Sequence, residues 1–153
     1  MKITPAIQKF ILNWSGIAAT WGMNRTVAQI HALLLASEEP LTTDDIKSVL
    51  QVARSNVSVS LRVLESLGLI QTVQVMGERK KRFEALKDIK QILKRIMGVR
   101  KKKEFESILK KLNECAMAFG KDPMDKGMQN QLNELTSVFG KLDTLYGKLI
   151  DEI

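Results

Sequence analysis

Short polar and guanidinium side chains, with no carboxylate among them, share one face of a helix predicted for residues 54–67. The apolar residues Val57, Leu61 and Leu64 follow helical spacing and should face inward. The polar residues that then face outward are Arg54, Ser55, Asn56, Ser58 and Arg62. In the major groove of duplex DNA, Asn can pair with adenine and Arg with guanine. The pattern favours a DNA-reading helix, and the alternative is the solvated face of an ordinary helix.

A second basic group lies in the turn of a predicted β-hairpin. Residues 69–76 are rich in β-branched residues and 82–86 alternate in polarity, which is typical of strands. The turn between them carries Arg79, Lys80 and Lys81. A basic hairpin directly after a polar-faced helix strengthens the DNA interpretation, although charged turns are also common as solvated loops.

The net charge of +7 is concentrated in the middle of the chain. Residues 1–53 are neutral overall, 54–82 carry +4, 87–103 carry +7 and 104–153 carry −3. Clustered positive charge suggests a polyanionic partner. The basic run at 100–103 is compatible both with contacts to flanking phosphates and with a solvated stripe on a long helix.

The elements around these residues predict a mainly α fold with a small β-hairpin wing. Helices are expected at 5–21, 25–38, a short stretch from 42, and 54–67, followed by the two-stranded hairpin. A long helix begins at 88 and either continues to about 119 or breaks near Gly98, and a last helix covers 124–150. This order predicts a winged helix-turn-helix flanked by helices with more apolar surface than one small core needs. Such helices favour a homodimer.

The expected organisation has three segments. Residues 1–22 form an N-terminal dimerisation helix, 23–86 the winged helix-turn-helix, and 87–153 a C-terminal helical dimerisation region. Catalysis is not expected, because no Gly-rich phosphate loop or nucleophile motif occurs and the single histidine, His31, suits no metal cluster or triad. His31 is instead predicted to be a helix-packing residue. No cofactor or metal is expected.

The chain resembles the MarR-like winged-helix transcription regulators, and more closely their GbsR branch. The resemblance rests on residues 39–46, 56–62, 65–70 and 77–81, with further similarity over 16–34. It implies a DNA-binding regulator of glycine betaine uptake and synthesis genes. We expect a sequence-specific homodimer at a palindromic operator, acting as a repressor.

The resemblance also implies roles for the basic and polar residues. Ser55, Asn56, Ser58 and Arg62 would face bases or nearby phosphates, and the 79–81 turn would lie near the minor groove. Two departures concern the turn before the helix. Gln51 stands where the family often has Gly at a left-handed position, and Ala53 stands where it often has a capping Ser.

Aromatic residues on the first helix suggest a ligand. Phe10, Trp14 and Trp21 share one face and are first interpreted as dimer-interface core. Because the GbsR branch is linked to choline-type ligands, and aromatic faces attract quaternary ammonium groups, the second interpretation is a pocket for a small cationic effector such as choline.

The cysteine content and the length of the apolar runs indicate the cellular compartment. A single cysteine, Cys115, suits a reducing cytoplasm and is expected to be a small buried residue, with a redox switch as the alternative. No apolar run approaches the length of a membrane helix, so no membrane partner is expected. The competing functions are a winged-helix adaptor in a larger protein assembly and an RNA-binding wing.

Overall fold

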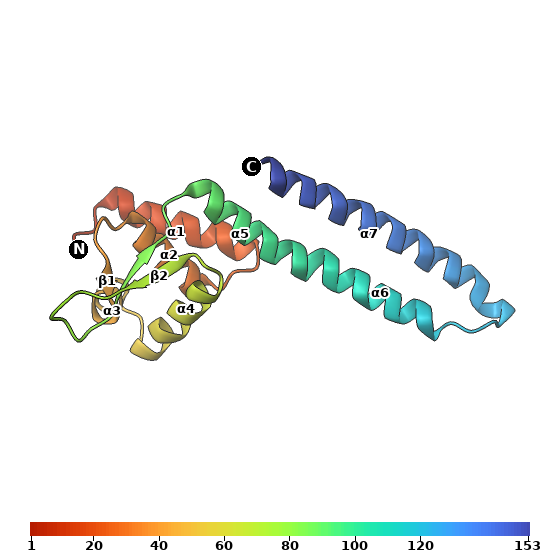
Figure 1. The fold of residues 1–153 in the computed structure, drawn as a ribbon, viewed down its shortest axis with the longest axis horizontal. Coiled ribbons are helices and arrows are strands. Elements are labelled where there is room, and N and C mark those ends of the chain that lie inside the picture. Colours follow the sequence, from red (N-terminus) through yellow and green to blue (C-terminus); the bar gives the residue numbers. More distant parts are fainter. The chain divides into compact units, whose positions relative to one another are not determined.

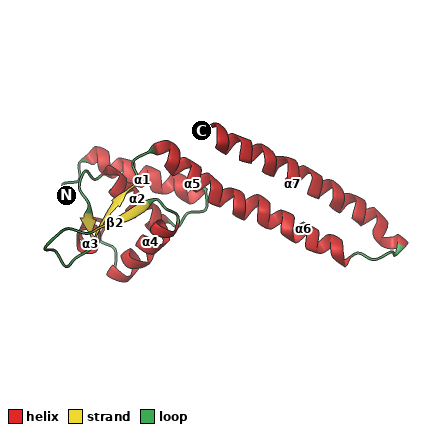
Figure 2. Ribbon diagram, in the orientation of Figure 1, coloured by secondary structure: helices red, strands yellow, loops and turns green.

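The computed structural model describes all residues, 1–153, and divides the chain into two compact units, Met1–Arg95 and Ile96–Ile153. The N-terminal helix lies in the same unit as residues 23–86, and the division falls after Arg95. The segments 1–22, 23–86 and 87–153, with their roles in dimerisation and DNA binding, stay a prediction. The elements confirm the predicted fold class of a mainly helical chain with a small antiparallel sheet (Figures 1 and 2).

Four helices form the body of the first unit: α1 (Pro5–Thr20), α2 (Arg25–Ala36), α3 (Thr43–Leu50) and α4 (Arg54–Ser66). Thr4 and Asn24 cap α1 and α2 by accepting backbone N–H bonds, and Pro5 occupies the first turn of α1, where no N–H partner is needed. Thr42 and Asp45 form a reciprocal capping box at α3. The predicted helix starts are therefore confirmed by local hydrogen bonds.

The sheet has three strands rather than the predicted two. β2 (Ile70–Val73) and β3 (Arg82–Ala85) pair antiparallel with Ile70 opposite Ala85, and β1 (Leu41–Thr42) pairs with the other edge of β3. β1 is only two residues long, so it shows no alternation by which sequence could reveal it. Its pairing fixes the start of α3 to the base of the wing.

The core of the first unit is centred on α2. Seven of its residues from Val27 to Leu34 are buried, and α1, α4 and β3 pack against it. Lys87 closes the far end of this helix, because its ammonium donates hydrogen bonds to the carbonyls of Leu34, Leu35 and Ser37 at 2.8–3.0 Å. These carbonyls would otherwise lack partners at the helix C-terminus.

The second unit is a helical hairpin. α5 (Ile89–Lys101) continues through the unit boundary and is followed by a five-residue π-helical segment, η1 (Lys102–Glu106), then α6 (Ser107–Ala118). A short 3-10 turn, η2 (Pro123–Asp125), leads into α7 (Lys126–Glu152), which packs against α6 and η1. The helix does not break at Gly98, and the irregularity occurs four residues later as a change of helical pitch.

One ion pair, Lys101–Asp143, and one pair of rings join the two arms of this hairpin, and two further ion pairs lie within the first arm. Lys101 lies 2.9 Å from Asp143 and 3.4 Å from Glu106, and Arg100 lies 3.0 Å from Glu104. The rings of Phe105 and Tyr146 are 5.4 Å apart. Half of the basic run at 100–103 is therefore engaged by carboxylates of its own unit.

Much of the apolar surface of the second unit is exposed. Ile96 and Leu132 are its only buried apolar side chains, whereas the exposed large ones are Met117, Met124, Met128, Leu135, Val138, Leu142, Leu145 and Leu149. The expectation that Cys115 is buried is wrong for this chain, because Cys115 lies on the exposed side of α6. None of the helices combines the length and apolar character that crossing a membrane requires.

Candidate nucleic-acid interface

The outward face of α4 carries the side chains that the sequence singles out. Arg54, Ser55, Asn56 and Arg62 are exposed and Ser58 is half-buried, while Val57, Leu61 and Leu64 are buried against the body of the unit. Val59 is 56% exposed between these polar groups. An apolar side chain at such a position can contact the methyl group of thymine, so Val59 joins the candidate face.

The turn before α4 has the two predicted departures from ideal geometry. Gln51 adopts φ 53°, the only positive φ outside glycine, and Ala53 makes no side-chain cap to α4. A non-glycine residue in this region costs about 1–2 kcal/mol, and a missing cap costs about 1 kcal/mol. The helix that carries the candidate base contacts therefore starts from a strained, uncapped turn.

The wing loop connects β2 to β3 and carries three exposed cations, Arg79, Lys80 and Lys81. At its base, Glu78 accepts two hydrogen bonds from Arg82, at 2.7 and 3.1 Å. This pairing lowers the pKa of Glu78 and raises that of Arg82. Gly77 supplies the positive φ of 85° at which the loop turns.

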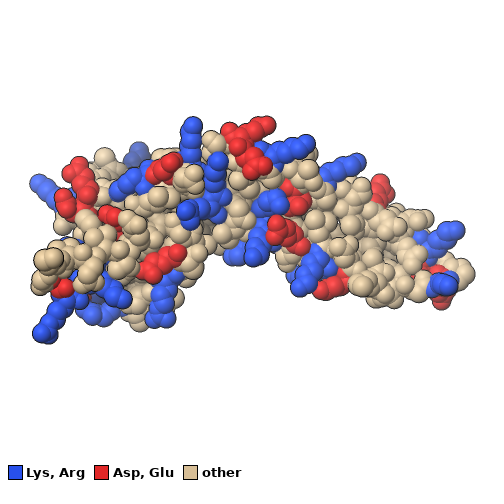
Figure 3. Space-filling model, viewed as in Figure 1, with Lys and Arg blue, Asp and Glu red and all other residues tan.

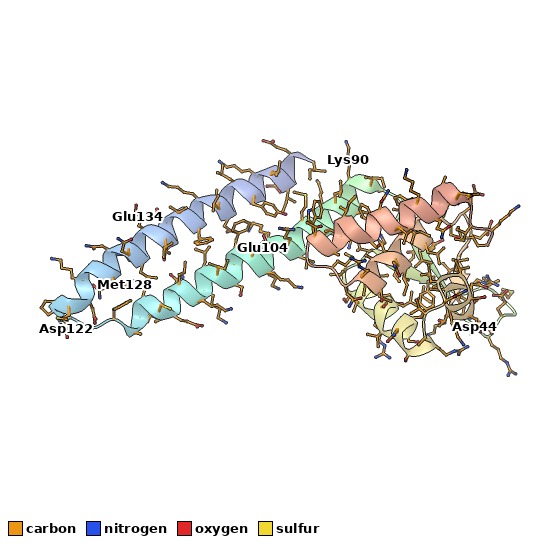
Figure 4. All side chains as sticks on the ribbon, turned by 180° about the vertical axis from the view of Figure 1, so that it is seen from behind. Asp44, Lys90, Glu104, Asp122, Met128 and Glu134 are labelled. Atoms are coloured by element: carbon orange, nitrogen blue, oxygen red, sulfur yellow. The ribbon has the colours of Figure 1, made fainter.

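Asp44 joins the wing loop to α4. Its carboxylate accepts a hydrogen bond from Lys80 at 2.8 Å through one oxygen and a bond from Arg54 through the other. The hydrogen bond from Lys80 is the main reason why the pKa of Asp44 lies below its ordinary value. Figure 4 labels Asp44 at the start of α3. Sequence patterns do not reveal this contact, because its partners lie 10 and 36 residues away along the chain.

Two neighbouring clefts open between α3, α4 and the wing. The first, of about 370 Å³, is lined by Thr42, Thr43, Asp44, Arg54, Lys80, Lys81 and Phe83. The second, of about 410 Å³, has Thr43, Ser58, Arg62, Glu65, Thr72 and Lys81 in its walls. Hydroxyl groups and cations in one concave surface suit phosphate oxygens. Basic side chains project from this end of the unit in Figure 3, at the lower left, with acidic groups among them.

Two of the three aromatic residues predicted to form a pocket, Phe10 and Trp14, have their rings stacked. Phe10 and Trp14 stack with ring centroids 6.2 Å apart, and Trp21 forms the C-cap of the helix. The indole N–H of Trp14 donates to Nδ1 of His31 at 3.1 Å. His31 is fully buried, as expected for a packing residue, and burial, aided by the charge of Lys87, lowers its pKa to about 4.

Comparison with known proteins shows what the chain is similar to. Residues 19–87 match the family model described as sugar-specific transcriptional regulator TrmB, a span that runs from the end of α1 to just past β3. A solved structure described as a transcriptional regulator superposes with a TM-score of 0.67 over 97% of each chain, at 15% identity. This match shows the fold. The chain therefore contains a winged-helix fold, and residues 19–87 are similar to TrmB-type transcription regulators.

Other solved regulators superpose less closely. MepR, a transcription regulator of the Staphylococcus aureus multidrug efflux pump MepA, gives a TM-score of 0.44 at 20% identity, over 89% of this chain and 98% of that one. A MarR-family transcription regulator gives 0.42 at 19% identity, over 92% and 87%. Comparison with curated protein sequences gives no match. The GbsR branch stays a prediction.

Proposed function

We propose that this protein is a sequence-specific DNA-binding transcription regulator that acts as a repressor at a palindromic operator. The observation that carries the proposal is the common surface of α4 and the wing. There Arg54 lines one cleft with Lys80 and Lys81, Arg62 lines the neighbouring cleft with Lys81, and Asp44 joins the two elements. A helix with this face fits the major groove, and a basic wing suits an adjacent narrow groove.

The regulator acts as a homodimer. Support comes from exposed apolar side chains on α7 (Leu135, Val138, Leu142, Leu145 and Leu149) and on α1 (Phe10, Leu12 and Ile17). An exposed apolar stripe at helical spacing, such as the one on α7, marks an interaction site in globular proteins. Two copies would present two recognition helices, which suits an operator with two-fold symmetry.

The test is duplex binding by the purified protein. A random duplex pool is selected against the protein, and the affinity of an enriched site and of its scrambled version is measured by fluorescence anisotropy between about 50 and 200 mM salt. We expect tighter binding to the enriched site, and affinity that falls steeply with salt for both. If no duplex binds at any salt concentration, the protein-interaction adaptor becomes the better hypothesis. Preference for single-stranded RNA would favour the RNA-binding alternative.

An effector pocket at Phe10, Trp14 and Trp21 extends the proposal. The stacked Phe10 and Trp14 rings support it, because aromatic faces attract quaternary ammonium groups. The family model names sugar-specific regulators, so sugars are the competing effector class. Titration with choline, and separately with neutral sugars, is followed by tryptophan fluorescence and by duplex affinity. A response to choline alone supports the GbsR-type assignment, and a response to sugars alone excludes it.

A further inference from the structure

Asp44 places a negative charge between two cations that the proposed interface needs. Arg54 is the first residue of α4 and Lys80 lies in the wing loop, and both side chains are mostly exposed. Their hydrogen bonds converge on the two oxygens of one carboxylate. The two cations therefore already hold an anion in the free protein.

The surroundings of this carboxylate resemble an anion-binding pocket. The cleft of about 370 Å³ around Asp44 also contains the side chains of Thr42, Thr43 and Lys81. A phosphate placed there would meet the guanidinium and ammonium groups that Asp44 now engages. Charge-assisted bonds from Arg and Lys to phosphate are of the same type as those to carboxylate.

The reciprocal cap at the start of α3 is made by residues other than Asp44. The N-terminus of α3 is capped by Thr42, whose hydroxyl accepts the N–H of Asp45, and by Asp45, whose carboxylate accepts the N–H of Thr42. Asp44 takes no part in this reciprocal cap. Exposed ion pairs also contribute little to folding stability. The position of Asp44 is thus better explained by its contacts with Arg54 and Lys80 than by a contribution to the stability of α3.

We propose that Asp44 is an intramolecular competitor for a DNA phosphate between the recognition helix and the wing. This inference rests on the proposed DNA-binding function and adds a determinant of affinity to it. When duplex DNA binds, Arg54 and Lys80 exchange the carboxylate for phosphate oxygens. Because each cation must give up the carboxylate, each phosphate contact contributes less binding free energy. This reduction is the same for every duplex, since phosphates carry no sequence information.

The test compares Asp44→Asn with the wild-type protein on the enriched and scrambled duplexes. Freeing both cations is expected to tighten binding to both duplexes by a similar factor, about 2- to 10-fold near 50 mM salt. The plot of log affinity against log salt should become steeper by about one to two per subunit. Asp44→Glu, which keeps a carboxylate, should bind like the wild type.

A matched control separates the local contact from net charge. Glu38→Gln changes the charge of the same unit by the same amount at an exposed position outside the cleft around Asp44, and it should leave the salt dependence unchanged. If Asp44→Asn impairs folding, Asp44→Ser replaces it and is judged by the same criteria.

Each outcome bears on the inference. Unchanged or weaker binding by a folded Asp44 variant overturns it, and weaker binding would mean that the carboxylate organises the two cations for DNA. An equal gain in affinity with Glu38→Gln also overturns it, since net charge would then explain the effect. If the wild type binds no duplex, the proposed function fails together with this inference.

Discussion

The two units of the chain differ in how completely they bury their own apolar residues. In Met1–Arg95, α2 is enclosed by α1, α4 and β3, and its apolar residues are almost wholly inaccessible. In Ile96–Ile153, only Ile96 and Leu132 are buried, and an apolar stripe on α7 remains exposed. The first unit encloses its own core, whereas the second leaves its apolar stripe uncovered. The charged candidate site lies on the unit that is already complete.

The largest expected effect concerns the stripe on α7. The double variant Leu142→Glu/Leu145→Glu should abolish the homodimer, because an interface cannot bury unpaired carboxylates, and should weaken association by at least about 3 kcal/mol. Light scattering at micromolar concentration should show the 17.2 kDa monomer in place of a particle of twice that mass. Asn133→Glu, on the opposite side of the same helix, is the control and should stay dimeric. A wild-type protein that is already monomeric would refute the dimer.

The second effect is a loss of folding stability at acid pH, and it comes from His31 in the core of the first unit. The pKa of His31 is lowered to about 4 in the folded chain, below the ordinary 6.5 of the unfolded state. The unfolded chain therefore binds the extra proton first, so stability is full above about pH 6.5 and falls by about 3 kcal/mol as the pH drops to about 4. Urea unfolding at fixed protein concentration measures this slope.

His31→Gln provides the comparison for that slope. Glutamine keeps an acceptor for the indole N–H of Trp14 but does not titrate. The variant should be less stable at neutral pH and should show little of the pH dependence between 6.5 and 4. The same slope in both proteins would show that other groups, such as the carboxylates, dominate the acid response.

The third effect distinguishes the two parts of the candidate DNA surface. Arg62→Ala should cost about 1–3 kcal/mol of binding to the enriched site and relax preference at one position of each half-site, if Arg62 pairs with guanine. Arg79→Ala should weaken binding to all duplexes alike and reduce the salt slope by about one for each phosphate that the variant no longer neutralises. If both variants bind duplex DNA as tightly as the wild type at every salt concentration, this surface is not the DNA interface.

The smallest effects come from one glycine in each unit. Gly68 has φ +69°, and a Cβ there would collide with Nη1 of Arg95, so Gly68→Ala should destabilise the protein by about 1–2 kcal/mol. Gly98 lies inside α5, and a Cβ there would meet nothing within 4 Å, so Gly98→Ala should stabilise by up to about 1 kcal/mol. Thermal melts should show a lower melting temperature for Gly68→Ala and a higher one for Gly98→Ala. Lower stability of the Gly98 variant would indicate that this face of α5 is covered in the dimer.

Local patterns predicted most of the fold. Helices α1 to α3 start at residues whose side chains bond to their own first turn, so Thr4 and Thr42 could be recognised as caps from their neighbours alone. The left-handed Gln51 and the uncapped Ala53 were predicted from the resemblance of the same short stretch to a known family. The burial of Cys115 was predicted wrongly, because the habits of its residue type do not reveal which side of α6 is covered.

The sequence by itself determined the helices, the wing and the polar face of α4, since each depends on spacing within a few residues of chain. Only the tertiary structure decided that β1 pairs with β3, that Lys87 caps α2, and that Asp44 links Arg54 to Lys80. These contacts join residues that only packing brings together, and the type of a charged residue does not reveal which distant residue it will pair with. The charges of the candidate site were therefore visible in the sequence, while their neutralisation by Asp44 was not.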